Sequence, residues 1–342
     1  MTVLVFAALL AQEWQPVVGK TGQFVNPSTM EQKSADDLLK HALARRQAKD
    51  FDAALAALNP LVQFMPEGST RENAHFERAQ TLRAAGRFYD AYDDYEKYIL
   101  RYPQMPNATE AKKQEMECAL ALAKTGYAER VLGVPLVSTS RTGIDFLKDA
   151  LRRYPREDFS AYYYRQLGIF YYERRDWDHA GEQFSLILDQ YSESPQSVLA
   201  LAWLGYTNEN RFKAVDYDIK PLKDARRFYE RFLEEADRMR QLPDPAKDWV
   251  NQLLDSIRER LAIVYQNLLE KSFRTAKYYD WKDLPWSSAV YYRSILKDDA
   301  TFRRVLPGFP ETEAVRRAKK RIPEIQAELR AEMEWSRAGM PK

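Results

Sequence analysis

The sequence contains little glycine, a single cysteine and almost no excess of charge of either sign. Of 342 residues, 12 are glycine and one is cysteine, while 52 Lys and Arg against 50 Asp and Glu leave a formal charge of +2. So few glycines disfavour glycine-rich phosphate loops and the many tight turns of a β-sheet protein. One cysteine forms neither an internal disulfide nor a cysteine-based zinc cluster. The balanced charge argues against nucleic acid as the partner.

Long hydrophobic runs are also missing. The run from Met1 to Ala11 is far shorter than the ~20 residues needed to span a bilayer, so no transmembrane helix is expected. It has the length of a secretory signal core and ends in small residues. Residues 1–11 are therefore predicted to be a signal peptide or apolar leader, which places the protein in the periplasm or cell envelope. The alternatives are a buried N-terminal segment and a chain whose true start lies upstream. Residues 12–34, with their prolines and glycines, are predicted to be an irregular leader.

What the sequence has in abundance is aromatic residues. Together, 21 Tyr, 16 Phe and 7 Trp make up 13% of the chain. Many aromatics and few glycines suit long helices that pack on one another. The composition therefore favours an all-α protein.

The chain also repeats itself. Its clearest unit consists of Tyr164-x2-Leu167-Gly168-x2-Tyr171, a turn, and Trp177-x2-Ala180-x3-Phe184. This unit resembles the tetratricopeptide pattern, in which small residues mark where two helices touch and large residues fill the gaps. Further units are centred on the small residues Ala54, Ala91, Ala150, Ala225 and Ala289. Because one helical hairpin cannot bury its apolar stripe alone, we predict a tetratricopeptide-repeat superhelix (α-solenoid) of about five to six hairpins.

The repeats divide the sequence into three parts. Residues 35–210 hold the N-terminal repeats, and residues 211–310 hold degraded C-terminal repeats with a long helix from about Asp248 to Asp280. Residues 311–342 are predicted to form a charged capping helix and tail, interrupted at Pro323.

Two features go beyond the generic repeat. One is the ending of second helices in Tyr-Pro, at Tyr102-Pro103 and Tyr154-Pro155. The other is a leucine-rich helix and a glutamate followed by Ala276-Lys277-Tyr278-Tyr279 and a short helix with Ala289. Over roughly residues 35–322, these features resemble the BamD-like family, the lipoproteins of the outer-membrane β-barrel assembly machinery. The resemblance implies a periplasmic helical scaffold with a role in outer-membrane assembly.

The chain departs from that family in two places. The family carries a lipobox cysteine just after its signal peptide, whereas the only cysteine here is Cys118. In addition, Asp280 to Pro285 stand where the family has a compact turn.

Motifs for chemistry are missing from the linear sequence. It has no H-E-x-x-H, G-x-S-x-G or G-x-G-x-x-G motif, and its three histidines stand in three different repeats. We therefore assign no catalytic, cofactor-binding or metal-binding residue and interpret the protein as a non-enzymatic scaffold.

Two alternatives stay open: a soluble repeat adaptor of another complex, and an enzyme with an acidic site hidden in the groove. Acidic pairs such as Asp93-Asp94 are candidates for the latter. The basic cluster at residues 316–321 is followed at once by glutamates, so nucleic acid is not the expected partner.

The binding surface is predicted on the first helix of each hairpin, at positions offset from the packing stripe. Aromatic and arginine side chains, which dominate protein-binding hot spots, recur there. Proteins or extended peptides with apolar side chains are the expected partners, β-barrel assembly components among them. The alternative is a groove filled by the chain's own insertions. The candidate groove residues are Arg46, Asn73, Phe76, Gln80, Arg83, Tyr162, Arg165 and Tyr172.

Overall fold

The computed structural model describes residues 14–125, 130–131, 134–135, 139–239 and 246–337. The predicted signal peptide, residues 1–11, lies outside these ranges. The chain forms two compact units, unit 1 (Met1–Tyr163) and unit 2 (Tyr164–Lys342). The sequence-based division after residue 210 reflects how well each repeat is preserved, and it stays a prediction.

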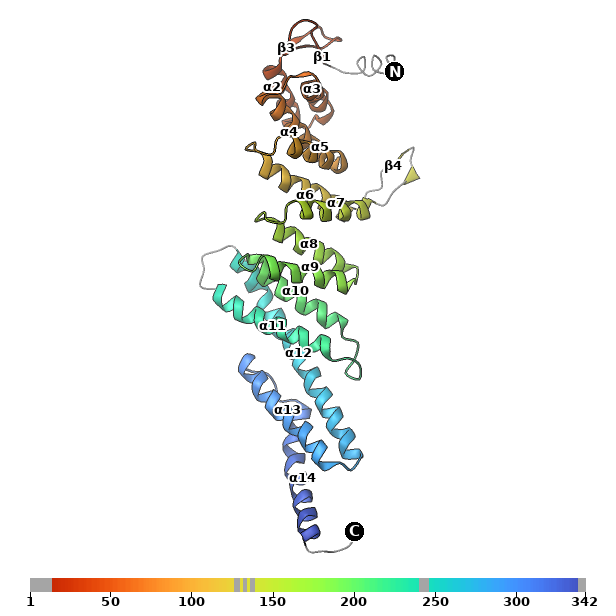
Figure 1. Ribbon diagram of the computed structural model, residues 1–342, viewed down its shortest axis with the longest axis vertical. Helices are drawn as coiled ribbons and strands as arrows, with labels where there is room; N and C mark the ends of the chain where they lie inside the picture. The colour runs from red at the N-terminus through yellow and green to blue at the C-terminus, as the bar shows by residue number, and fades with distance from the viewer. Residues whose placement is uncertain (1–13, 126–129, 132–133, 136–138, 240–245, 338–342) are drawn as a thin grey trace. The chain divides into compact units, whose positions relative to one another are not determined.

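Unit 1 is a run of helical hairpins preceded by short strands (Figure 1). Successive helices pack on one another from α2 to α7. Its elements are β1 (Gln15–Pro16), β2 (Gln23–Val25), β3 (Gln32–Ser34), α2 (Ala35–Gln47), α3 (Phe51–Phe64), α4 (Ser69–Ala84), α5 (Phe88–Arg101), α6 (Ala108–Thr125), β4 (Arg130–Val131), β5 (Val134–Pro135), α7 (Thr139–Arg153) and the start of α8 (Ser160–Glu173).

Unit 2 continues the same arrangement, with successive helices in contact from α9 to α14. The predicted long helix is present as α12. In the described residues of the whole chain, α2 to α13 form six hairpins and α14 follows them, which confirms the all-α hairpin array. The remaining elements are α9 (Trp177–Gln190), α10 (Pro195–Arg211), α11 (Lys220–Met239), α12 (Ala246–Trp281), α13 (Pro285–Val305) and α14 (Glu313–Arg337).

One turn recurs between the first and second helices of four hairpins. In each, a residue with positive φ ends the first helix: Lys49 (61°), Gly86 (75°), Arg175 (60°) and Asp283 (53°). The next residue donates its backbone N–H to the carbonyl five residues earlier at 2.9–3.0 Å, as in the Schellman motif. The segment from Asp280 to Pro285 differs in sequence from the compact turn of the BamD-like family. It nevertheless makes the same turn as the other three hairpins.

Side-chain caps fix where several helices begin. Asp50 accepts a hydrogen bond from the Ala53 N–H at the start of α3, and Asp176 accepts one from the His179 N–H at the start of α9, both at 3.3 Å. These contacts satisfy backbone donors that have no partner inside the helix. Because both aspartates directly follow the positive-φ residue, turn and cap recur as one unit.

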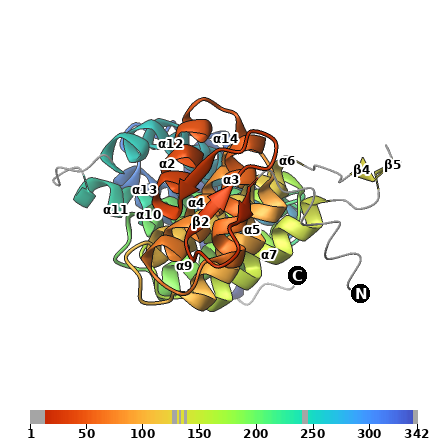
Figure 2. The ribbon, with the colours of Figure 1, turned by 90° about the horizontal axis from the view of Figure 1, so that it is seen from above.

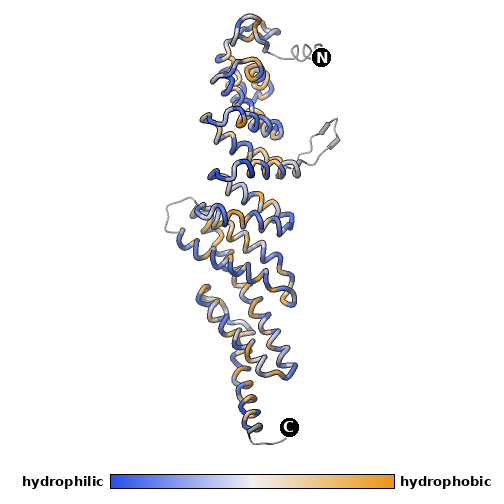
Figure 3. Tube along the Cα trace, in the orientation of Figure 1, coloured by the Kyte–Doolittle hydropathy of each residue, from blue (hydrophilic) through white to orange (hydrophobic). Residues whose placement is uncertain are grey.

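The small residues that mark the repeats lie where helices touch. Ala54, Ala91, Ala180 and Ala225 are fully buried, and Ala289 is 1% exposed. Large side chains such as Phe184 and Tyr229 fill the neighbouring space, also without exposure. Hydrophilic and hydrophobic residues alternate along the helices (Figure 3), as expected when one stripe of each helix is buried. The small residues that the repeat pattern places at helix contacts are thus the ones buried in the core.

Residues 14–34 differ from the prediction of an irregular leader. β1, β2 and β3 form a three-stranded antiparallel sheet against α2 and α3 (Figures 1 and 2). Trp14 and Phe24 are buried, and they pack into a core that includes Leu38, Leu58 and Leu61. The segment is ordered because it covers apolar surface that the first hairpin leaves exposed.

The C-terminal helix also differs from its prediction, because α14 runs through Pro323 without interruption. The proline ring removes one backbone donor and leaves the carbonyl of Lys319 without its helical partner. Both residues are exposed, so water can satisfy that carbonyl. The inner side of α14 buries Val315, Ala318 and Ile325, which hold the helix on unit 2.

Candidate functional site

The candidate groove residues lie on three of the first helices of the hairpins: α2 and α4 in unit 1, and α8, which begins in unit 1 and continues in unit 2. The other first helices are α6 in unit 1 and α10 and α12 in unit 2. We call the surface of all these first helices the first-helix face, and we describe it separately for each unit. A regular set of polar contacts crosses it in unit 1. Thr70 donates to Asp36 at 3.0 Å, Arg46 to Gln80 at 3.0 Å and Arg83 to Glu117 at 3.3 Å. Each pair is 34 residues apart, which is the length of a tetratricopeptide repeat.

In unit 1, two predicted residues, Arg46 and Gln80, contact each other directly. Arg46, on α2, also pairs with Glu77, which lies on α4 like Gln80. Asn73 is exposed near the start of α4. Arg83 carries its ion pair to Glu117 with a side chain 41% exposed. These side chains form a polar, partly exposed surface.

Phe76 requires a correction. It is 6% exposed, and its ring packs against the rings of Tyr95 and Tyr98 at centroid distances of 6.2 and 5.4 Å. Burying an aromatic ring against two others is favourable, so Phe76 packs α4 on α5 and offers no surface to a partner.

The predicted residues of α8 fall on both sides of the unit boundary. Tyr162, in unit 1, is 38% exposed and lies edge-on to Tyr163. In unit 2, Arg165 donates to Gln196 of α10 at 2.7 Å. Tyr172 accepts a hydrogen bond from Asn210 of α10 at 2.8 Å. The contacts between first helices thus recur in unit 2.

Aromatic rings are continuous across the first-helix face of unit 2. Tyr172 of α8 meets Trp203 of α10 edge-on at 5.1 Å, and Trp203 meets Tyr206 at 5.6 Å. The guanidinium of Arg260, on α12, lies 4.8 Å from the centre of the Tyr206 ring. All four side chains are partly exposed. We call Tyr172, Trp203, Tyr206 and Arg260 the aromatic ladder.

Glu209 positions the cation of the ladder. It accepts from Arg260 at 3.1 Å and from the hydroxyl of Tyr229 at 2.7 Å. Burial lowers the pKa of Arg260, but the carboxylate of Glu209 outweighs this effect and leaves that pKa raised. Burial raises the pKa of Tyr172, so its hydroxyl stays neutral. The ladder is therefore a neutral aromatic surface with one fixed cation, itself balanced by a carboxylate.

Sequence reasoning missed three of the four ladder residues. Trp203 and Tyr206 stand 34 residues after Ile169 and Tyr172, so extending the clearest repeat by one period would have found them. Arg260 lies on the much longer α12, where no 34-residue step leads to it. Only the packing of α12 beside α10 brings it to the ladder.

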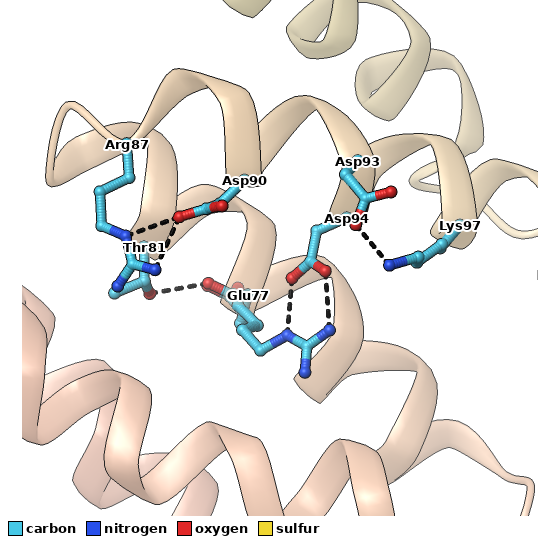
Figure 4. A network of polar contacts seen from close by, with 8 residues as sticks. Glu77, Thr81, Arg87, Asp90, Asp93, Asp94 and Lys97 are labelled. Carbon is cyan, nitrogen blue, oxygen red and sulfur yellow. Dashed lines mark hydrogen bonds and ion pairs between the residues drawn. The ribbon is translucent and has the colours of Figure 1, made fainter. Parts of the chain in front are cut away.

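The two carboxylates of Asp93-Asp94, a candidate for a hidden acidic site, are engaged by cations (Figure 4). Arg78 holds Asp94 through two hydrogen bonds of 2.6 and 2.7 Å, Lys97 pairs with Asp93, and Arg87 donates to Asp90 at 2.8 Å. Paired carboxylates of this kind tie α5 to α4 and brace α5 internally. Asp93 and Asp94 therefore act as ion-pair partners and not as a converging acidic pair.

Asp298, which stands beside Asp299 as another acidic pair of the sequence, lines a cavity of about 710 Å³ between α11, α12 and α13. Burial raises its pKa, against the effect of Arg226. Among the described residues, no group of three or more His, Cys, Asp or Glu side chains is placed to hold a metal ion. Within those same ranges, no helix is both long and apolar enough to cross a membrane.

The shared turn, the buried small residues and the contacts across 34 residues define this chain as an all-α array of tetratricopeptide-type hairpins. No family model matches the sequence, and no curated protein matches it. A tetratricopeptide repeat protein from Parabacteroides merdae aligns over 80% of this chain and 97% of its own, at 12% identity and a TM-score of 0.36. A thermophilic tetratricopeptide repeat protein from Thermus thermophilus aligns over 68% and 98%, at 18% identity and a TM-score of 0.30.

Proposed function

We propose that this protein is a non-enzymatic scaffold of the cell envelope that binds proteins along its first-helix face and takes part in outer-membrane protein assembly. The observation that carries the binding role is the aromatic ladder of unit 2. Three half-buried rings and an arginine on the first helices of three consecutive hairpins have the composition of a protein-binding hot spot. The envelope location and the assembly role rest on the apolar leader and on the resemblance to the BamD-like family.

The ladder favours a particular kind of ligand. Its rings offer flat apolar area, while the guanidinium of Arg260, which has more N–H donors than the one that Glu209 accepts, offers donors at its edge. An extended peptide with apolar or aromatic side chains at intervals would place those side chains on the rings and its backbone carbonyls toward the donors. Because Glu209 balances Arg260, a strongly acidic peptide gains little there.

The test combines a direct binding measurement with recovery of partners. Fluorescence anisotropy with a labelled peptide of alternating apolar and polar residues, the pattern of a β-barrel strand, should show saturable binding. The variant Tyr172→Ala/Tyr206→Ala should weaken it by about thirtyfold or more, since even one hot-spot truncation costs ~2 kcal/mol. Tyr217→Ala is the matched control, because Tyr217 is an exposed tyrosine of the same unit that lies outside the first helices.

Affinity purification from membranes then decides the cellular role. Recovery of a β-barrel assembly protein by the wild type, and its loss with the double variant but not with Tyr217→Ala, supports the proposal. Recovery of cytosolic proteins alone would favour the soluble adaptor. Equal peptide binding by the double variant and the wild type would contradict the assignment of the ladder.

A further inference from the structure

A second surface with exposed aromatic residues lies at the turn between α12 and α13, away from the aromatic ladder. Five large apolar or aromatic side chains within thirteen residues are about half exposed or more. We call them the aromatic tip; they are Tyr278 (52%), Trp281 (74%), Leu284 (48%), Trp286 (61%) and Val290 (59%). Single exposed apolar residues are common, but a group of this kind indicates an interaction surface.

The fold itself forces these side chains outward. α12 ends at Trp281, the Schellman turn at Asp283 reverses the chain, and α13 begins at Pro285. The Tyr278 and Trp281 rings lie 6.2 Å apart on the last turn of α12. On α13, Trp286 and Val290 are four residues apart and so share one face of the helix. The tip thus has exposed aromatic and apolar side chains on both sides of a tight turn.

One lysine without a carboxylate partner lies on the tip, and two more line a cavity of the same unit. The amine of Lys282 lies 4.5 Å from the centre of the Trp281 ring and 5.9 Å from that of Tyr278. Lys277, on α12, shares a cavity of about 390 Å³ with Lys320 of α14. All three lysines are exposed, and among the described residues none has an ion pair.

Most acidic groups nearby contact one of two arginines, Arg317 and Arg321. Asp280 accepts hydrogen bonds from Ser288 and Tyr292 at 2.6 and 2.8 Å and pairs with Arg321. Arg321 also pairs with Glu324 and Glu328. The remaining carboxylate of the cavity belongs to Glu313, which pairs with Arg317. Asp283, in the turn, is an exposed acid beside the tip. Among the charged groups named here, all of them in the described ranges, three lysines and one carboxylate therefore have no ion-pair partner.

We propose that the aromatic tip docks this protein on a lipid bilayer that contains anionic lipids. Trp and Tyr carry an apolar ring with a polar edge and favour the boundary between acyl chains and headgroups, while lysine amines reach anionic headgroups. An interface with another protein would instead be depleted in lysine. This attachment is independent of peptide binding at the aromatic ladder.

The experiment is co-sedimentation of the full chain with vesicles. Vesicles of phosphatidylglycerol and phosphatidylcholine in equal parts should bind the protein at low salt, and vesicles of pure phosphatidylcholine should bind it much more weakly. Trp281→Ser/Trp286→Ser should lower partitioning by about tenfold or more, because binding scales with the apolar area inserted. Lys277→Gln and Lys282→Gln should each lower it about fivefold. Tyr217→Ser is the matched control for removing an exposed aromatic ring.

Three results would overturn the proposal. They are the absence of binding to the mixed vesicles, equal binding by the double tryptophan variant and the wild type, and a doubling of mass in light scattering that the tryptophan variant abolishes. The last would assign the tip to self-association. Because both tryptophans are exposed, the double variant should keep the wild-type melting temperature, and that measurement separates a loss of docking from a loss of fold.

Discussion

Gly205 of α10 lies against the ring of Tyr229 of α11 so closely that a Cβ at position 205 would stand 2.1 Å from Cε1 of that ring. The ring is fully buried, and its hydroxyl donates to Glu209, which in turn holds Arg260 of the aromatic ladder. A contact at the core of a hairpin therefore positions a residue of the binding surface.

Replacing this glycine should disturb both stability and binding. Gly205→Ala should cost about 2 kcal/mol or more of unfolding free energy, since overpacking in a dense core typically costs 1–3 kcal/mol. It should also weaken peptide binding through the displaced Tyr229. Gly181→Ala is the control, because a Cβ there meets nothing nearer than 3.7 Å and alanine is the better helix former. Chemical unfolding of both variants measures the difference; equal stabilities would contradict the close approach.

The turn shared by four hairpins gives a pair of opposite predictions. Gly86 has a φ of 75° and open space around its Cβ position, so Gly86→Ala should lose about 1 kcal/mol for backbone reasons alone. Arg175 has the same left-handed conformation with a side chain, so Arg175→Gly should gain stability of a similar size. Thermal and urea unfolding test both. A loss of stability on Arg175→Gly would mean that its side chain makes a contact worth more than the strain.

His75 should make stability depend on pH. Burial, aided by nearby Arg78, lowers the pKa of His75 to about 4. Between the ordinary value of 6.5 and about 4, the unfolded chain binds a proton that the folded chain does not. Stability is therefore expected to fall as the pH falls through this range, by at most ~3 kcal/mol from this group. His75→Gln should flatten the dependence measured by urea unfolding. An unchanged slope in that variant would show that His75 is not the cause.

Arg153 of α7 joins three helices through two carboxylates. It donates to Glu115 of α6 at 2.5 Å and to Glu96 of α5 at 2.6 Å. Glu115 is fully buried, and burial raises its pKa to about 7 against the effect of Arg153. Arg153→Met should cost ~3–5 kcal/mol, because it leaves a buried carboxylate without its partner.

The pH dependence separates this mechanism from lost packing. The pKa of Glu115 is higher in the folded protein than in the unfolded chain, so this group lowers the stability of the fold as the pH rises from about 4.5 through 7. Without the arginine this effect grows, so the loss in Arg153→Met should be larger at pH 8 than at pH 5. The second substitution in Arg153→Met/Glu115→Gln should recover part of the loss at pH 8. A loss of equal size at both pH values would contradict the electrostatic account.

Single positions show which contacts follow from the sequence and which do not. The spacing of Ala54, Ala91 and Ala180 was enough to predict where helices touch, because only a small side chain allows close approach and the pattern repeats. Phe76 could not be assigned in the same way. It stands at a groove position of its helix, but the crossing of α4 and α5 brings Tyr95 and Tyr98 over it, and that crossing depends on residues far along the chain.

The sequence by itself determined the helical hairpins, their register and their turns, since each depends on residues near one another in the chain. Few glycines and many aromatics indicated this outcome, and most of the described glycines lie at positive φ or at close helix contacts such as Gly205. Only the tertiary structure decided that residues 14–34 form a covering sheet, that Arg260 joins Trp203 and Tyr206, and that two tryptophans stand exposed at a turn. Each of these depends on how separate helices pack, and packing is fixed by the whole set of buried side chains and not by any local pattern.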